Sequence, residues 1–251
     1  MLMVEQLQKS FGGVAALDGC SFNAAESHIT AIIGPNGAGK STLLNCISGA
    51  TKPDRGRITL FDNNVTAEKP HRLARAGLAR TFQISRELSS LTLLENVLLA
   101  QQSQSDEHFF APIFLRGRIL KEEKEATQRA MQLLTRVGLE RLADETASVL
   151  SGGQKKLLEL ARALMLNPRV VLLDEPAAGV APPMVQVLIE VIKGLQGKGV
   201  SFILVEHNMD MVAALSDHVV VMAEGKKLVE GTFKDVTSDR RVADAYLGGV
   251  L

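Results

Sequence analysis

The sequence contains the run Gly34-Pro35-Asn36-Gly37-Ala38-Gly39-Lys40-Ser41-Thr42, which fits the phosphate-binding pattern G-x-x-x-x-G-K-[ST], the P-loop. Its glycines let the backbone turn tightly and bring N–H groups against phosphate oxygens without a Cβ in the way. Lys40 supplies a mobile positive charge for the β- and γ-phosphates, and the Ser41 hydroxyl is a hard oxygen ligand for Mg²⁺. The run therefore predicts a nucleotide site that also holds Mg²⁺.

The residues on either side of this run have the pattern that a P-loop requires. The apolar, β-branched run His28-Ile29-Thr30-Ala31-Ile32-Ile33 predicts a buried strand, and after the loop Leu43, Leu44 and Ile47 fall on one face of a helix that should end near Gly49. The N-terminus of that helix points its dipole at the phosphates. A glycine-rich turn without a ligand is the alternative, and the agreement of strand, loop and helix disfavours it.

Two adjacent carboxylates form a second candidate element. The continuous apolar run Val170–Leu173 predicts a strand covered on both faces, and it ends in Asp174 and Glu175, at the strand edge that lies beside a P-loop. Asp174 is expected to hold Mg²⁺, directly or through water, and Glu175 to orient and polarise the attacking water. Adjacent acids at a strand end are usually a solvated turn, but the P-loop upstream favours the catalytic interpretation.

Composition limits the classes of protein that fit. The chain has 251 residues, and its 28 basic and 28 acidic side chains cancel, which argues against a broad nucleic-acid surface. Cys20 and Cys46 match no metal spacing and are expected to be small buried residues. Met1–Val4 leads straight into polar residues, so no signal peptide is expected, and no apolar run approaches the length of about 18 residues that spans a bilayer. We expect a protein soluble by itself, with any membrane role through a partner.

The rest of the chain divides by pattern into three regions. Short strand patterns at residues 2–8, 20–24 and 57–61, the last before an Asp62-Asn63-Asn64 turn, predict a small, mainly antiparallel subdomain. Residues 85–165 are interpreted as a helical insertion, with a helix over 117–137 that Gly138 stops. Its helically spaced apolar residues are Ala126, Ala130, Met131, Leu133, Leu134 and Val137. Within the insertion, the apolar run Phe109–Leu115 either packs inside the helical subdomain or forms an exposed docking patch.

The last third of the chain returns to a parallel-sheet pattern. A helix from Pro182-Pro183 to Gly197 is followed by a strand at 201–205, which fits a right-handed crossover. A terminal hairpin of 219–222 and 227–229 and a short helix over 240–247 are expected next. The predicted buried stripe of the long helix is Val187, Leu188, Val191, Ile192 and Leu195.

The run Leu150-Ser151-Gly152-Gly153-Gln154 lies between the P-loop and the Asp-Glu strand end. A serine and two glycines at a helix N-terminus expose hydroxyl and backbone donors to an anion. With this signature the chain resembles the ABC-type ATPases over essentially its whole length. The resemblance implies ATP as ligand and one α/β nucleotide-binding domain over 1–251: a P-loop core with a mainly parallel sheet, an N-terminal antiparallel β subdomain and the helical insertion. It also implies that Ser151, Gly152, Gly153 and Gln154 contact ATP held by the opposite subunit of a head-to-tail dimer.

Three further residues match the family by position. Gln83, in Ala79-Arg80-Thr81-Phe82-Gln83, corresponds to the glutamine that senses Mg²⁺ and the attacking water, so the implied metal ligands are Ser41, Gln83 and Asp174. His207 corresponds to the switch histidine that contacts the γ-phosphate and joins Glu175 and Gln83 as an implied catalytic residue. Phe11 lies where the family places a ring on adenine, and a partly buried core residue is the equal alternative.

Three short sequence features indicate which branch of the family the chain resembles. After Glu175-Pro176 the chain reads Ala177-Ala178-Gly179-Val180, without the aspartate that the family usually has in this loop, which puts an acidic contact across the dimer in doubt. This loop, the run 79–83 and Ala245-Tyr246-Leu247-Gly248 are similar to the ATP-binding subunits of branched-chain amino-acid importers, although importers of urea and other small amides share them.

The resemblance implies an ATP-hydrolysing motor on the cytoplasmic face of a membrane. Its implied partners are membrane permease subunits, a second ATPase subunit, identical or related, and indirectly a solute-binding protein, with no nucleic acid. A soluble ABC ATPase acting on DNA or ribosomes is the alternative, but it predicts a long coiled coil or two cassettes, and this sequence has one cassette and no sustained heptads. A switch that binds ATP without hydrolysis is disfavoured by Glu175 and His207.

Overall fold

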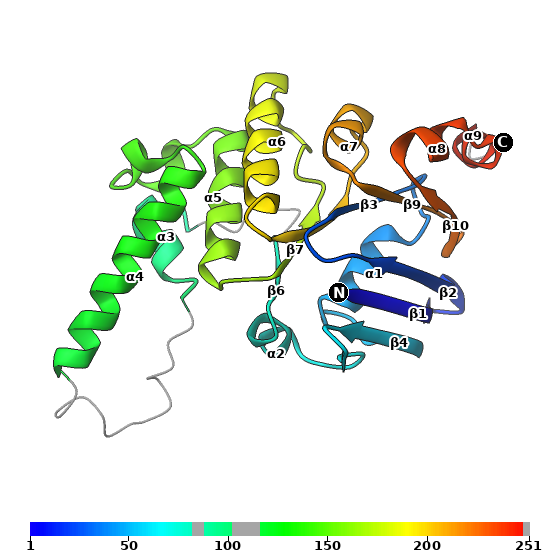
Figure 1. Cartoon of the computed structure of the whole chain (residues 1–251), viewed down its shortest axis with the longest axis horizontal. Helices are drawn as coiled ribbons and strands as arrows, with labels where there is room; N and C mark the ends of the chain where they lie inside the picture. Colours follow the sequence, from blue (N-terminus) through cyan, green and yellow to red (C-terminus); the bar gives the residue numbers. More distant parts are fainter. Residues whose placement is uncertain (82–87, 102–115, 248–251) are drawn as a thin grey trace. The chain divides into compact units, whose positions relative to one another are not determined.

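The computed structural model describes residues 1–81, 88–101 and 116–247, which belong to two compact units (Figure 1). The first unit comprises Met1–Gln83 with Arg169–Leu251, and the second comprises Ile84–Pro168. Gln83 and Phe109–Leu115 lie outside the described residues. Within the described ranges, no helix combines the length and the apolar character that crossing a membrane requires.

The first unit is built on two sheets. One is antiparallel, with strand order β2-β1-β4-β5, and the other has the order β10-β9-β3-β8-β7-β6, parallel from β9 to β6 with β10 antiparallel at its edge. The antiparallel strands are β1 (Leu2–Phe11), β2 (Val14–Ala24), β4 (Arg55–Leu60) and β5 (Asn63–Asn64). Those of the larger sheet are β3 (Ile29–Ile33), β6 (Leu78–Arg80), β7 (Val170–Asp174), β8 (Ser201–Val205), β9 (His218–Ala223) and β10 (Lys226–Gly231). The predicted α/β class with a mainly parallel sheet is confirmed.

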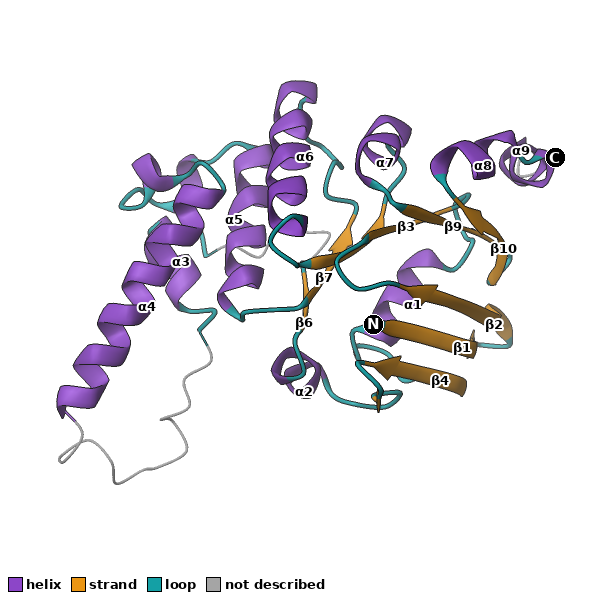
Figure 2. Ribbon diagram, viewed as in Figure 1, coloured by secondary structure: helices purple, strands orange, loops and turns teal. Residues whose placement is uncertain are grey.

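Helix α1 (Lys40–Ile47) fills the space between the two sheets. Alternate residues of the central strands, such as Leu172 and Val205, share a buried cluster with α1 and the antiparallel strands. The intervening residues are also buried, because α6 (Pro182–Gln196) and α7 (Met209–Leu215) lie on the opposite face of the sheet (Figure 2). This double cover explains why β3, β7 and β8 read as continuous apolar runs.

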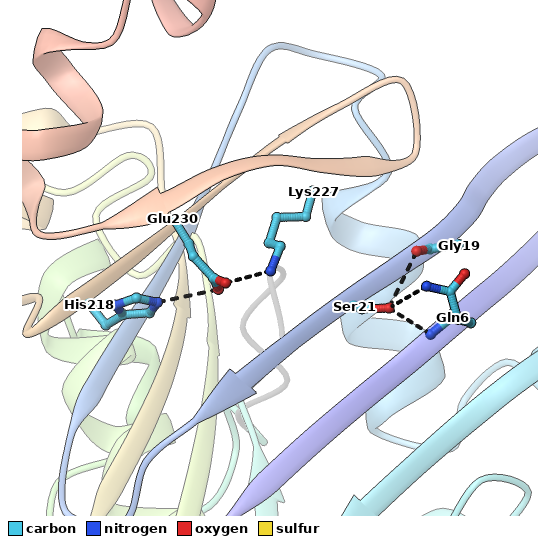
Figure 3. Close-up of polar contacts among 6 residues, drawn as sticks. All are labelled: Gln6, Gly19, Ser21, His218, Lys227 and Glu230. Atoms are coloured by element: carbon cyan, nitrogen blue, oxygen red, sulfur yellow. Dashed lines mark hydrogen bonds and ion pairs between the residues drawn. The ribbon is translucent and has the colours of Figure 1, made fainter.

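The remaining helices of this unit are short. They are α2 (Pro70–Arg75), before β6, and the C-terminal pair α8 (Phe233–Ser238) and α9 (Arg240–Leu247). In the hairpin of β9 and β10, the Glu230 carboxylate contacts both His218, at 3.4 Å, and Lys227 (Figure 3). Burial acts to raise the pKa of Glu230, but the hydrogen bonds from Lys227 and His218 outweigh it and hold the pKa below its ordinary value.

Several predicted boundaries and faces were wrong. Strand β1 extends to Phe11, beyond the predicted end at residue 8, and β2 begins at Val14, before the predicted start at residue 20. A bulge at Gln6, where φ is 46°, breaks the alternation of buried and exposed residues on which the prediction depended. The turn before β5 uses residues 61 and 62, whereas 63 and 64 pair with β4. In α6, Val185 and Ile189 are buried in place of Val187, which is 37% exposed, and Val191, which is half-buried.

The second unit is helical in its described parts. It consists of α3 (Leu93–Leu98), α4 (Arg116–Arg136) and α5 (Gly152–Met165), with 3₁₀ turns at Glu140–Leu142 and Ala147–Val149. The predicted stripe of α4 is buried apart from Met131, which is half-buried, and Gly138 follows the helix with φ 72°. Asn96 is fully buried and bonds to the backbone of Leu88 on both its donor and acceptor sides, at 3.0 and 2.9 Å.

Candidate nucleotide site

The loop between β3 and α1 is shaped by glycines that the surrounding backbone does not allow to be replaced. Gly34 has φ 150°, and a Cβ there would lie 2.1 Å from the carbonyl oxygen of Met222. Gly39 has φ 97°, and its Cβ would lie 2.4 Å from the carbonyl oxygen of Ala16. Because both obstacles are backbone atoms, a side chain at either position would push the loop out of place. The P-loop therefore takes its shape from packing as well as from its own sequence.

Lys40 is the first residue of α1, and its side chain folds back over the loop. Its ammonium donates to the carbonyl oxygens of Gly34 and Pro35, at 2.8 and 2.9 Å, and the residue is only 5% exposed. Burial lowers the pKa of Lys40, and the nearby Glu175 carboxylate acts in the opposite direction. The charges of Lys40, the predicted phosphate-binding residue, and Glu175, the predicted catalytic acid, therefore influence each other.

A cavity of about 230 Å³ connects the P-loop with two segments far away in the sequence. Its wall combines the P-loop with Ala16 of β2, Glu175 after β7 and His207 after β8. The P-loop residues in the wall are Asn36, Gly37, Ala38, Gly39, Lys40, Ser41 and Thr42. A larger cavity of about 900 Å³ lies beside β1, β2 and the β9–β10 hairpin, the region of Figure 3, and includes none of the predicted site residues. The smaller cavity is therefore the candidate site.

Glu175 and His207 meet at the edge of this cavity. His207 Nε2 lies 3.2 Å from Glu175 Oε1. Glu175 has φ 49°, an uncommon conformation for a residue with a side chain, and its N–H donates to the carbonyl oxygen of Val205 at 2.9 Å. The chain thus bends sharply at the end of β7. Both side chains keep part of their surface exposed, 21% for Glu175 and 41% for His207, so reactants can reach them.

Asp174 is the last residue of β7 and is 4% exposed. Its Oδ2 accepts a hydrogen bond from Arg80 Nη2 at 2.8 Å, and the other Arg80 nitrogen, Nη1, donates to Asn45 Oδ1 at 2.7 Å and Ser48 Oγ at 2.8 Å. Arg80 thereby connects β6, the C-terminal end of α1 and β7. The prediction had not singled it out, because its three partners lie 32 to 94 residues away in the sequence.

The donor set suits Mg²⁺. Asp174 Oδ1 is buried and has no hydrogen-bond partner in the described part of the chain, and Ser41 lines the same cavity as Glu175. Hard oxygen atoms of this kind are the ligands that Mg²⁺ takes from proteins. No three His, Cys, Asp or Glu side chains converge in the ranges that the structure describes.

Glu206 is a second residue that the prediction did not single out. It is 2% exposed, and its carboxylate accepts backbone N–H groups from Ala177 at 2.6 Å, His207 at 2.9 Å and Asn208 at 3.0 Å. An acidic residue after an apolar strand indicates a solvated turn, so the sequence contains no signal for this burial. Its contacts link the segments that carry Glu175 and His207.

The ABC transporter family model matches residues 17–178, which contain the P-loop, the signature and the Asp174-Glu175 strand end. The chain belongs to the ABC transporter family. It is 39% identical, over 99% of its length and 95% of the relative, to a probable branched-chain amino acid transport ATP-binding protein, LivG, of Archaeoglobus fulgidus. It is 37% identical to the high-affinity branched-chain amino acid transport ATP-binding protein BraF of Pseudomonas aeruginosa, over 99% of this chain and 98% of the relative.

Solved cassettes share the fold. An ATP-binding cassette of an ABC transporter in its ADP conformation superposes with a TM-score of 0.86 at 38% identity, covering 99% of this chain and 98% of that one. A dimeric cassette in a post-hydrolysis state with ADP and Pi superposes with a TM-score of 0.75 at 25% identity, over 93% and 99% of the two chains. The chain is therefore an ABC-type ATPase, as the resemblance had implied.

Phe11 and the signature are predicted site elements that do not belong to the residues lining this cavity. Phe11 ends β1 and is 52% exposed, with the Lys9 ammonium 5.3 Å from the ring centroid, so the alternative of a partly buried core residue is wrong. The signature starts α5 in the second unit. Ser151 is the N-cap, its hydroxyl accepts the Gln154 N–H at 3.4 Å, and the Gln154 side chain accepts the Ser151 N–H at 2.9 Å, with Gly152 and Gly153 in the first turn.

Proposed function

We propose that this ABC-type ATPase is the motor subunit of a membrane importer for branched-chain amino acids or related small polar solutes. The observation that carries the proposal is the identity of 36–39%, over almost the whole chain, to relatives named as branched-chain amino acid transport ATP-binding proteins. The same relatives disfavour the alternative of a soluble ATPase acting on DNA or ribosomes. The two compact units together form the single nucleotide-binding domain, over residues 1–251, that such a motor requires.

In the proposed reaction the P-loop backbone and Lys40 hold the β- and γ-phosphates of ATP. Ser41, Asp174 and Gln83 would hold Mg²⁺, which would supply positive charge to neutralise the charge that develops on the phosphates. The Glu175 carboxylate accepts the proton of the attacking water, and His207 contacts the γ-phosphate and restrains Glu175 through the 3.2 Å contact. The position of Glu175 and His207 after the C-terminal ends of the neighbouring parallel strands β7 and β8 supports these roles.

We further propose that two cassettes act head to tail. Ser151, Gly152, Gly153 and Gln154 present hydroxyl and backbone donors at the start of α5 for the ATP of the opposite subunit, and the exposed Phe11 ring stacks on adenine. The solved dimer of a related cassette with ADP and Pi supports this assembly. The loop after Glu175 has no acidic side chain in residues 177–180, so a cross-dimer contact there would use the backbone.

The proposed partners follow from the transport role of the relatives. Two membrane permease subunits would dock beside Gln83 and the helical unit, on the cytoplasmic face of the membrane. The second ATPase would be an identical or related chain, and a solute-binding protein would act with the permeases. Affinity capture of the tagged chain from gently solubilised native membranes tests this assembly. Recovery of permease chains supports it, whereas recovery of ribosomes or DNA-repair proteins would favour the soluble alternative.

Steady-state ATPase assays test the catalytic proposal. Glu175→Gln keeps the shape of the side chain but removes the base, so turnover should fall by roughly 10²–10⁴-fold while ATP still binds. Glu190→Gln, on the exposed side of α6, is the matched control and should leave turnover unchanged. Lys40→Ala should instead weaken ATP binding itself. Normal turnover in the Glu175 variant would refute the assignment of the base.

A further inference from the structure

The buried carboxylate of Glu206 bridges the two segments that carry Glu175 and His207. Oε1 accepts the N–H of Ala177, in the turn that follows β7, and Oε2 accepts the N–H groups of His207 and Asn208, which follow β8. The bridge between Glu206 and Ala177 spans 29 residues of sequence. One side chain therefore fixes both segments relative to each other.

The chemistry of this bridge favours a carboxylate over other side chains. An ionised carboxylate only accepts hydrogen bonds, and three backbone donors meet its two oxygens. Hydrogen bonds to a charged acceptor are roughly twice as strong as neutral ones, and a buried carboxylate without them would be costly. The neutral amide of a glutamine would direct its NH₂ donor at the backbone N–H donors of one of the two segments, where no hydrogen bond can form. Glu206 can thus hold both segments at once, whereas glutamine can satisfy only one of them.

The turn after β7 needs such an external anchor. Glu175 has φ 49°, which is strained for a residue with a side chain. Ala177, Ala178 and Gly179 follow it and have no polar side chain with which to restrain the turn. The turn's backbone bonds run from Ala178 N–H to Glu175 O at 3.0 Å, from Val180 N–H to Ala177 O at 3.1 Å and from Glu175 N–H to Val205 O at 2.9 Å. The bond from Ala177 N–H to Glu206 adds a restraint on the turn from a buried side chain outside it.

We propose that Glu206 is a positioning residue for ATP hydrolysis. By holding Ala177 and His207 together it sets the distance between the Glu175 carboxylate and the His207 ring, and it does not touch the reactants itself. The inference rests on the proposed function, in which Glu175 is the base. Its consequence is selective: loss of the bridge lowers turnover but leaves the P-loop grip on ATP intact, because the Glu206 carboxylate bonds to the segments after β7 and β8.

The variant Glu206→Asp separates the two halves of the bridge. Aspartate readily accepts the N–H groups of the next residues along its own chain, so the bonds to His207 and Asn208 can persist. Its side chain is one methylene shorter and no longer reaches Ala177. In the full-length chain we expect kcat to fall by roughly 10–100-fold, with the Kd for ATP within about twofold of wild type. Amide hydrogen exchange should accelerate at Ala177 and stay slow at Asn208.

A control variant and a double variant test the role of Glu206. Glu190→Asp is the matched control and should change neither kcat nor exchange. In a Glu175→Gln background, Glu206→Asp should cause little further loss of turnover, because Glu206 acts through Glu175. Normal kcat in Glu206→Asp despite faster exchange at Ala177, or a fully additive loss in the double variant, would overturn the inference. Unchanged exchange at Ala177 would overturn it as well.

Failure of the proposed function gives a different result. A wild-type chain that does not hydrolyse ATP, or a Glu175→Gln variant with normal turnover, would count against the motor and its base. The exchange experiment would still decide whether Glu206 bridges the two segments. Glu206→Gln is a second variant: its amide can satisfy only one side of the bridge, so it should lower kcat at unchanged ATP affinity, and normal kcat in it would contradict the role of the charge.

Discussion

Removal of Arg80 should destabilise the cassette through Asp174. The variant Arg80→Met keeps much of the side-chain length but leaves the Asp174 carboxylate, 4% exposed, without its guanidinium partner, and it removes the hydrogen bonds to Asn45 and Ser48. Breaking a buried ion pair by removing one partner costs about 3–5 kcal/mol. Because Arg80 itself is 14% exposed, solvent screening reduces this figure little. The melting temperature of a chain of this size should then fall by roughly 6–20 °C.

Circular dichroism during thermal and urea unfolding measures this effect, since the chain has no tryptophan. The control Arg57→Met, at an exposed position of β4, should stay within about 0.5 kcal/mol of wild type. The double variant Arg80→Met with Asp174→Leu should recover most of the loss, because it no longer buries an unpaired charge. A loss below about 1 kcal/mol in Arg80→Met, or no recovery in the double variant, would refute the reasoning.

The remaining predictions concern side chains and glycines within each of the two units. Gly34→Ala should lower the melting temperature more than Gly37→Ala, because the added Cβ meets the Met222 carbonyl oxygen at 2.1 Å at the first position and open space at the second. Cys20 and Cys46, whose burial raises the pKa of each thiol to about 11, should react with iodoacetamide at pH 8 only after unfolding. Since the unfolded thiols ionise first, the free energy of unfolding should decrease as pH rises from 9 to 11, which urea titrations at each pH measure. Asn96→Ala should cost roughly 2–4 kcal/mol in urea unfolding, because it removes the hydrogen bonds between the fully buried Asn96 amide and the backbone of Leu88, Leu91 and Thr92.

The parts of the site that were predictable have a local signal in the sequence. The P-loop needs only its own glycines, lysine and serine, and the strand before it and the helix after it are continuous with it. Asp174 and Glu175 directly follow an apolar run, so the predicted end of that strand was enough to predict their position. By contrast, the partners of Arg80 lie 32 or more residues away, and the bridge of Glu206 to Ala177 spans 29 residues, so neighbouring residues do not indicate these contacts. Their roles depend on which strand ends the fold brings together.

The errors in the fold have equally specific causes. On α6, Val187 and Val191 are as apolar as Val185 and Ile189, so helical spacing alone allows two overlapping stripes. The stripe through 185, 188, 189, 192 and 195 is the one that the sheet covers. At Gln6 the bulge reverses the inward and outward order of side chains, so alternation could not follow β1 to its end. In both places the packing partner decides the outcome.

The end of β8 determines where the proposed base lies. Three successive residues contribute: the Val205 carbonyl accepts the Glu175 N–H, the Glu206 carboxylate accepts the Ala177 N–H, and the His207 ring meets the Glu175 side chain. A conformation with φ 49° costs on the order of 1–3 kcal/mol, which these contacts must offset. The P-loop has its own supports at Ala16 and Met222. It follows that a displacement of the β8 end would move Glu175 and His207 together while the phosphates stay in the P-loop, so the rate of hydrolysis can change without a change in ATP affinity.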